Sequence, residues 1–300
     1  MEFATVELPR AMTPDQATEL IGDKVPDLQP NITTASVVVD ANTKEPQFAY
    51  LPVTDTAELR RSVLGLHYSK MSRAQGYASA STTFGYSPRR PVYGREGCGQ
   101  SQVARDQPRN HRPLAEWASR LQHMLHDIAP EIVEHDQLAL KAVDESWRLG
   151  ESDLWTSGVI NRTSRLPYHR DTFNFNTWSA MPVLRRHVTG GYLAIPEYGA
   201  VIACRDSWAV FFPGYRLVHG VTPMHAQRDD GYRISIVYYA LKGMKDCFTA
   251  AVETEYAKKR RTEREREMAA RLKTGDTGVP RKPELSRKTS GRLIRGVQEH

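Results

Sequence analysis

The chain has 300 residues, of which 40% are hydrophobic and 25% charged, with a formal net charge of +6. A chain of this size can bury one large core or two modest ones. It has no apolar run approaching 18 residues and no basic, apolar start, which excludes a transmembrane helix and a secretory signal and predicts a soluble, intracellular protein. Its cysteines, Cys98, Cys204 and Cys247, lack paired spacing, which argues against a disulfide framework and a zinc site.

The positive charge is concentrated in two segments. Residues 257–300 hold 14 Lys and Arg against 6 Asp and Glu, and residues 60–120 hold 11 against 3, so each segment carries a net charge of +8. Such segregation favours a polyanionic partner over a generally soluble surface. For the C-terminal segment alone, a solvated basic helix is an open alternative.

The first 110 residues predict an N-terminal extension. Residues 32–40 and 47–53 read as a β-hairpin, and residues 54–56 should cap a short helix that runs to Leu66. Residues 68–107 are rich in Gly, Ser, Tyr and Arg and have neither a helical nor a strand period. A loop of this length inside a domain is typical of a functional or a disordered segment.

Aromatic residues alternate with arginines in residues 84–95 of this loop. Aromatic rings stack on bases and arginines neutralise phosphates, so we expect the loop to contact nucleic acid through Arg89 and Arg90. A surface lid with incidental arginines is the alternative.

Two helices should follow. Pro113 is expected to begin the first, whose apolar stripe runs from Leu114 to Ile128, and Pro130 should end it. A second helix is predicted over residues 131–144. The stripe indicates core packing.

Strands dominate from Trp155 onward. Candidates cover residues 156–161, 166–171, 176–180, 191–195, 201–204, 209–212 and 233–241. Short strands punctuated by Gly and Pro predict a mainly β fold with flanking helices (α+β), of the sandwich or jelly-roll kind. We therefore divide the chain into an extension (1–110), a catalytic core (111–256) and a basic tail (257–300) that is helical and then disordered.

The most informative motif is His169-Arg170-Asp171, followed about 50 residues later by His219. Two imidazoles and one carboxylate can bind one face of Fe(II) and leave the opposite face open. Residues i and i+2 of an extended strand point the same way, so His169 and Asp171 can share a metal. His219 ends an apolar, β-prone run and is followed by Gly220, which suits a close approach to a site.

Arg233 and Ser235 complete the pattern, because strand alternation puts them on one face and Arg matches a carboxylate in two hydrogen bonds. In its order of residues the chain resembles the Fe(II)- and 2-oxoglutarate-dependent dioxygenases. The resemblance covers roughly residues 155–244. It is carried within that superfamily by H-x-D-x-x-N (residues 169–174), Gly190-Gly191-Tyr192-Leu193 and His219-Gly220-Val221, which look like the TET and J-binding-protein branch.

The resemblance implies a double-stranded β-helix core with His169, Asp171 and His219 as ligands of Fe(II). It also implies that Arg233, with Ser235, holds the distal carboxylate of the cosubstrate 2-oxoglutarate, which is decarboxylated with O₂ to succinate and CO₂. Asn161 is a weaker candidate for a 2-oxoglutarate contact. His187 and His225 are alternative metal ligands, but each is more typical of a surface histidine.

The resemblance further implies a DNA substrate whose pyrimidine 5-methyl group, in 5-methylcytosine or thymine, is hydroxylated after the base is flipped out. Asn174 matches the position that contacts the base edge, and its amide can both donate and accept; a backbone contact beside the metal is its alternative role. Aromatic residues 173, 175 and 178 line either the pocket or the core. The compact size suggests a phage or microbial enzyme, acting in the cytoplasm or nucleoid.

Two other functions stay open. The first is a dioxygenase that hydroxylates a free nucleoside or another small molecule. The second is a non-catalytic DNA-binding protein on the same fold.

Overall fold

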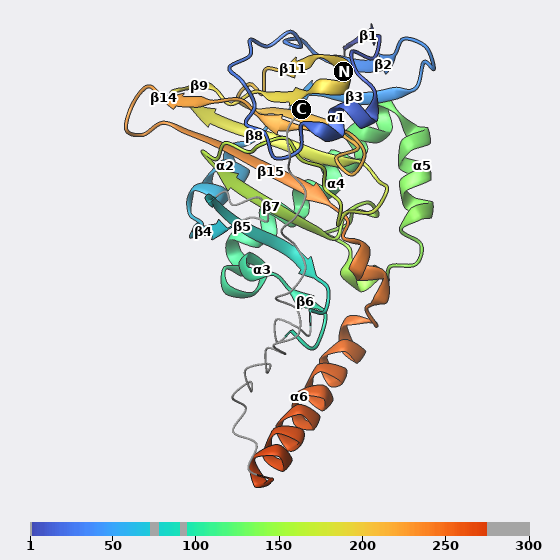
Figure 1. The fold of residues 1–300 in the computed structure, drawn as a ribbon, viewed down its shortest axis with the longest axis vertical. Helices are drawn as coiled ribbons and strands as arrows, with labels where there is room; N and C mark the ends of the chain where they lie inside the picture. The colour runs from blue at the N-terminus through green and yellow to red at the C-terminus, as the bar shows by residue number, and fades with distance from the viewer. Residues whose placement is uncertain (1, 73–77, 91–94, 275–300) are drawn as a thin grey trace, which may run out of the picture. The chain divides into compact units, whose positions relative to one another are not determined.

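A computed structural model describes residues 2–72, 78–90 and 95–274 (Figure 1). It separates into two compact units, Met1–Ala257 and Lys258–His300. The first unit holds the sheets and the candidate site. The second unit falls within the predicted basic tail, and residues 275–300 of that tail, predicted to be disordered, lie outside the described part. In the described part, no helix is long and apolar enough to cross a membrane.

The main sheet has ten strands (Figure 1). Its order is β1 (Ala4–Leu8), β2 (Ser36–Asp40), β3 (Pro46–Pro52), β12 (Trp208–Phe212), β8 (Ser179–Arg186), β15 (Tyr232–Tyr239), β7 (Ser157–Arg162), β5 (Ala78–Ser87) and β4 (Ser69–Ser72), with β6 (Gly99–Gln100) paired to β5. β1 and β2 are parallel, and the other pairs are antiparallel.

Two smaller sheets accompany it. One orders β11 (Ala200–Ile202), β10 (Leu193–Ile195) and β13 (Gly220–Val221), and the other pairs β14 (Met224–Ala226) with β9 (Val188–Gly190). A mainly β fold with flanking helices was predicted, and this arrangement confirms it.

Both faces of the main sheet are covered, as the alternation along β15 illustrates. Ile234, Ile236 and Tyr238 join the core that contains the helical residues Leu114 and Leu121. On the opposite face of the sheet, side chains of β3, β8 and β12 form a second core with β10 and β11 of the smaller sheet. Because side chains alternate along a strand, the residues between those of β15 in the first core face this second side.

The α-helices precede β7 in the sequence, except for α6, which follows β15. They are α1 (Pro14–Glu19), α2 (Ala57–Leu64), α3 (Gln102–Asp106), α4 (Pro108–Ile128), α5 (Pro130–Ala139) and α6 (Ala250–Lys273), with short 3-10 turns η2 (Glu145–Trp147), η3 (Pro196–Tyr198) and η4 (Lys242–Asp246). The predicted stripe of α4 is buried at Leu114, Trp117, Leu121 and Leu125.

Three expectations for the local structure need correction. The first helix begins at Pro108, so Pro113 lies inside it as the sixth residue. There it costs one helical hydrogen bond, because its nitrogen has no hydrogen to donate to the Arg109 carbonyl. Residues 166–171 form an isolated bridge rather than a strand. Residues 68–107 are not one long loop, because they include β4, β5, β6 and α3.

β5 escaped the sequence pattern because its residues ASASTTFGYS are mostly small and polar. Its six pairs with β7 place it inside the main sheet, where Ser81 and Thr82 are buried. Hydrogen bonding to β7, rather than an apolar alternation, defines this strand.

Candidate active site

His169, Asp171 and His219 come together, with one potential ligand atom from each lying within 4.8 Å of the others. His169 and His219 form an antiparallel bridge in which each backbone N–H donates to the other's carbonyl at 2.9 Å. Asp171 is held next to them because its N–H donates to the Gly214 carbonyl at 2.9 Å. Two segments 50 residues apart are thus bound directly at the residues that carry the ligands.

Hydrogen bonds of the Nδ1 atoms orient the two imidazole rings. Nδ1 of His169 donates to the Pro167 carbonyl at 2.8 Å, and Nδ1 of His219 donates to the Leu217 carbonyl at 3.0 Å. A carbonyl can only accept, so each Nδ1 carries a proton, and in the neutral imidazole this tautomer leaves the Nε2 lone pair free. The Nε2 atoms lie 3.8 and 3.9 Å from the two oxygens of Asp171.

The environment keeps His219 neutral. Burial lowers the pKa of His219, the neighbouring His169 lowers it further, and Asp171 opposes the shift only in part. A neutral imidazole is the form that binds a metal. His219 therefore needs no deprotonation near pH 7 to act as a ligand.

Two glycines make room for this arrangement. A Cβ on Gly214 would lie 2.7 Å from Oδ2 of Asp171, and one on Gly220 would lie 2.5 Å from the Val25 side chain and 3.0 Å from the Tyr168 nitrogen. The close approach expected at Gly220 is therefore real. Gly214 was not identified from the sequence, although the Pro213-Gly214 turn was a visible signal.

Support behind the ligands comes from Glu197 and Arg170. Glu197 is 1% exposed, and its Oε1 accepts the Val218 N–H at 2.8 Å, next to His219. Arg170, between the two ligands of the H-x-D motif, donates to the Arg216 carbonyl and to Thr18 Oγ1 of α1, both at 2.8 Å. No sequence motif indicated Glu197, because its role depends on the fold.

Arg233 and Ser235 lie on the face of β15 opposite to Ile234 and Ile236, as alternation requires. Arg233 is 1% exposed, and its Nε and Nη2 have no hydrogen-bond partner among the described residues. These two nitrogens form one edge of the guanidinium, the edge that binds a carboxylate through two parallel hydrogen bonds. Gly191 is required beside it, because a Cβ there would lie 2.7 Å from Cδ of Arg233.

A cavity joins the ligand residues to β7 and β15. Its lining includes Asn161, Ser235 and Tyr239 together with His169, Asp171 and His219. Oδ1 of Asn161 accepts a hydrogen bond from Ser81 at 2.8 Å. Asn161 and Ser235, both predicted cofactor contacts, are direct neighbours across β7 and β15.

Asn174 lies at the end of the turn that begins at Asp171. Its N–H donates to the Asp171 carbonyl at 3.0 Å, and it forms a bridge with Leu241. The residue is 5% exposed, yet its Nδ2 has no hydrogen-bond partner among the described residues. A buried, unpaired amide is costly, which is expected where a ligand supplies the missing acceptor.

The other candidates lie elsewhere. His225 is exposed on β14, and His187 pairs with Asp230 at 2.8 Å; neither belongs to the metal cluster. Trp178 is 7% exposed in the main core and Phe175 packs on another core cluster, so these aromatics do not line the cavity. Phe173 is 73% exposed.

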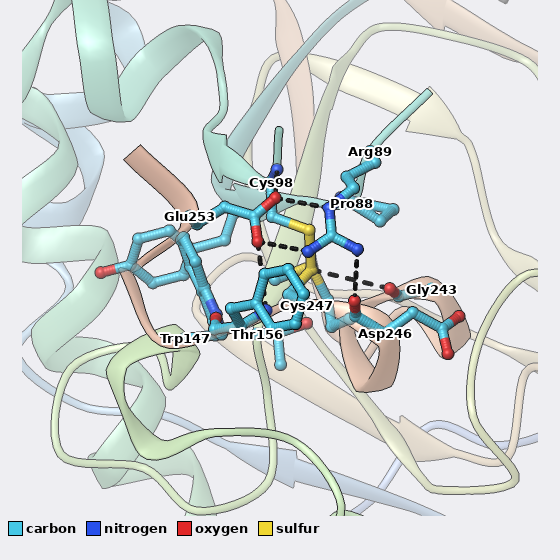
Figure 2. The surroundings of a disulfide bond; sticks show 12 residues. Pro88, Arg89, Cys98, Trp147, Thr156, Gly243, Asp246, Cys247 and Glu253 are labelled. Carbon is cyan, nitrogen blue, oxygen red and sulfur yellow. Dashed lines mark hydrogen bonds and ion pairs between the residues drawn. A yellow bond between two sulfur atoms is a disulfide. The ribbon is translucent and has the colours of Figure 1, made fainter. Parts of the chain in front are cut away.

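Arg89 has partners within the protein. Figure 2 shows its guanidinium between Glu253 and Asp246: Nε and Nη2 donate to the two oxygens of Glu253 at 2.6 Å, and Nη1 donates to the Asp246 carbonyl at 2.6 Å. The same guanidinium lies 4.6 Å from the Phe248 ring. These contacts argue against the expected DNA contact by Arg89. Arg90 is exposed and pairs with Arg95 through its backbone, and residues 91–94 of the predicted aromatic loop lie outside the described part.

Cys98 and Cys247 form a disulfide beside this ion pair (Figure 2). The expectation that the cysteines have no disulfide partner is wrong, because the fold brings together two residues that are 149 apart in sequence. Glu253 also accepts the Cys98 N–H at 2.6 Å and the Phe248 N–H at 3.1 Å. We call Arg89, Cys98, Cys247 and Glu253 the β5–α6 joint.

Comparison with known families identifies the family to which the chain belongs. The family model Tet_JBP, the oxygenase domain of the 2OGFeDO superfamily, matches residues 91–242. The chain belongs to this family. A search of the curated proteins found no match.

Two solved structures are similar to this Tet_JBP oxygenase at low sequence identity, and the first shares its fold. NgTET1, in a complex with 5mC DNA, has 16% identity and a TM-score of 0.52, and the match covers 78% of this chain and 93% of that one. A 2OG-Fe(II) oxygenase family protein from Burkholderia pseudomallei has 15% identity and a TM-score of 0.44, with 64% and 84% covered.

The Tet_JBP oxygenase is an Fe(II)- and 2-oxoglutarate-dependent enzyme, and its residues fit both groups. Two neutral imidazoles and a carboxylate are the donor set of such Fe(II) sites. The unpaired edge of Arg233 fits a carboxylate of 2-oxoglutarate. When bound, these groups and O₂ supply the oxidising chemistry, and the protein orients the reactants and excludes water.

Proposed function

We propose that this enzyme hydroxylates the 5-methyl group of a pyrimidine in DNA, 5-methylcytosine or thymine, and yields the 5-hydroxymethyl base. The observation that carries the proposal is the buried and unpaired Nδ2 of Asn174 beside the metal ligands. Membership of the Tet_JBP family indicates that the reaction is an oxidation. The Asn174 amide could form hydrogen bonds with the edge of a base.

Asn174 suits this role in position and chemistry. It is three residues beyond Asp171 and is tied to it by the turn hydrogen bond, so a group bound there lies close to the metal. Its amide presents a donor and an acceptor, as the Watson–Crick edge of a pyrimidine does. A flipped base would satisfy the unpaired donor through its own acceptors.

The other residues of the site would hold the iron and the cosubstrate. His169, Asp171 and His219 would hold the iron, while Arg233 and Ser235 would hold the distal carboxylate of 2-oxoglutarate and Asn161 would contact its other end. Apolar side chains of Val159, Met181, Leu193 and Val221 also line the cavity. They would exclude water from the reacting methyl group, which favours hydroxylation of substrate over damage to the site.

Positive charge is available for the phosphates of DNA. In the described part of the second unit, α6 is exposed and carries Lys and Arg, and the segment 257–300 has a net charge of +8. Exposed Arg90 stays a predicted contact, whereas Arg89 does not. Non-specific phosphate contacts of this kind hold DNA while a base is extruded.

The experiment is nucleoside mass spectrometry of duplex DNA incubated with enzyme, Fe(II) and 2-oxoglutarate. Oligonucleotides that contain 5-methylcytosine or only thymine should be tested beside the free nucleosides. A hydroxymethyl product from DNA is expected. Oxidation of the free nucleosides alone would favour the small-molecule function, and the absence of succinate with every substrate would favour a non-catalytic protein.

Asn174→Ala should reduce oxidation of DNA much more than succinate formation in the absence of DNA, because Asn174 is not a metal ligand. Asn176→Ala is the matched control, since Asn176 is the same residue type two positions on and is exposed. If Asn174→Ala lowered both activities equally, Asn174 would have a structural role instead.

Removal of residues 258–300 should weaken DNA binding while oxidation of a short oligonucleotide continues at low salt. The logarithm of affinity should then fall less steeply with the logarithm of salt, by about 0.9 for each lost phosphate contact. An unchanged slope would show that the tail does not touch DNA.

A further inference from the structure

Phe173 is an exposed aromatic residue beside the metal ligands. Its exposure is 73%, and of the eight phenylalanines only Phe248, at 47%, is also exposed. Phe248 has partners, because its ring lies 5.5 Å from that of Tyr256 and 4.6 Å from the Arg89 guanidinium. No ring or cation contact to Phe173 occurs among the described residues. Single exposed apolar residues are common on protein surfaces, so it is the position of Phe173, two residues from Asp171, that makes its exposure relevant.

The backbone around Phe173 is fixed. Phe173 and Thr172 are the central residues of a turn closed by the hydrogen bond from the Asn174 N–H to the Asp171 carbonyl, at 3.0 Å. In such a turn the first and last Cα atoms lie less than about 7 Å apart. The carbonyl of Phe173 accepts the Lys242 N–H at 3.0 Å. The ring is therefore presented on a rigid turn whose two ends are a metal ligand and the proposed base contact.

Positive charge lies at the same turn as Phe173. Lys242 is exposed, and its Nζ donates to the Thr172 carbonyl at 3.2 Å, which keeps the ammonium on the same turn. An ammonium nitrogen has three donors, so others remain for a phosphate. An aromatic ring and a cation on one rigid turn are the two groups that single nucleic acid bases and their phosphates bind.

We propose that Phe173 is the residue that enters the DNA stack when the target base leaves it. This inference rests on the proposed function. Asn174 would bind the extruded base inside the site, and the adjacent Phe173 would stack on the bases that the extrusion separates. Flipping costs unstacking and unpairing, and an inserted apolar side chain recovers part of that cost.

The test compares two duplexes with one 5-methylpyrimidine each. In the first the target base is paired, and in the second it faces an abasic site, so that it leaves the stack at little cost. Phe173→Ala should lower kcat/KM on the paired duplex by roughly five- to 150-fold, the range expected for the loss of one base–aromatic stack. On the second duplex most of the wild-type kcat/KM should be retained, and Phe173→Trp should restore turnover of the first.

Controls separate this role from a structural one. Because the ring is exposed, Phe173→Ala should keep iron binding and a melting temperature within about 2 °C of wild type. Leu138→Ala, which truncates a side chain that is 71% exposed on α5, should leave turnover of both duplexes unchanged.

Three results would overturn the inference. Full activity of Phe173→Ala on the paired duplex would remove the stacking role, and equal losses on both duplexes would make the effect structural. If the wild-type enzyme oxidised neither duplex, the proposed function would fail together with this inference. The first two results leave wild-type DNA oxidation intact, so the failures are distinguishable.

Discussion

The active site and the β5–α6 joint both bury polar and charged groups, but some of the groups in the site have no hydrogen-bond partner among the described residues. In the joint, Glu253 is 0% exposed and accepts hydrogen bonds from Arg89 and from two backbone amides. In the site, Arg233 and Asn174 are as deeply buried and yet have unpaired donors. Unpaired buried groups are costly, so Arg233 and Asn174 are candidates for contacts with bound ligands. Arg89 and Arg233, both expected to contact a ligand, thus differ: Arg89 has partners within the chain and Arg233 has an unpaired edge.

The iron ligands should give the largest effect. His169→Ala, Asp171→Ala and His219→Ala should each abolish turnover and leave the fold intact, because each removes one of three ligands from a site whose backbone is held by other residues. Succinate formation, iron content and melting temperature are measured together. His225→Ala, an exposed histidine of β14, is the control and should be fully active. Normal turnover in the His219 variant would contradict the ligand assignment.

Breaking the joint should affect stability instead of chemistry. Glu253→Ala leaves the Arg89 guanidinium and two amides without their acceptor, so the free energy of unfolding should fall by about 2–5 kcal/mol. Denaturant titration measures it. Glu263→Ala, which breaks an exposed pair with Arg260 on α6, should cost less than about 1 kcal/mol. Loss of turnover by Glu253→Ala, at a temperature where it is folded, would show that the joint serves the site as well.

Asp136 is another buried carboxyl, and its protonation should make the stability of the protein depend on pH. Burial raises the pKa of Asp136 to about 6, although hydrogen bonds from His135 and from the Trp178 N–H oppose the shift. A raised pKa means that the folded state binds the proton more tightly. The stabilising contribution of this group is therefore complete below about pH 3.8 and is lost as the pH rises through about 6.

Asp136→Asn tests this window, because its amide does not titrate. Between pH 4 and pH 7 the wild-type free energy of unfolding should decrease relative to that of Asp136→Asn, by up to about 3 kcal/mol. Denaturant titrations at several pH values give the difference. A constant difference across this range would mean that the Asp136 carboxyl has an ordinary pKa.

Arg233→Lys should give the smallest of these effects. An ammonium cannot reproduce the two parallel hydrogen bonds, and the loss of one charged hydrogen bond costs about 1.5–3 kcal/mol, so the KM for 2-oxoglutarate should rise roughly ten- to hundredfold. Arg186→Lys, an exposed arginine of β8 paired with Asp230, is the matched control. An unchanged KM in the Arg233 variant would assign the carboxylate contact to another residue.

Much of the site could be predicted because its signals are local. Alternation along a strand places Arg233 and Ser235 on one face, and the donor chemistry of two histidines and an aspartate predicts iron. The stripe of α4 and the hairpin of β2 and β3 also depend on short-range periodicity and turn residues. The fold class follows from such elements taken together.

The sequence by itself determined the mainly β fold and the use of iron and 2-oxoglutarate, and it supplied the residues that we propose to hold them, His169, Asp171, His219 and Arg233. Only the tertiary structure decided which polar groups are paired. Arg89 meets Glu253 across 164 residues, Cys98 meets Cys247 across 149, and β5 becomes a strand because β7 lies beside it. The physical reason is that a residue's type and its near neighbours set what it can bind, whereas its actual partner depends on distant segments brought together by packing.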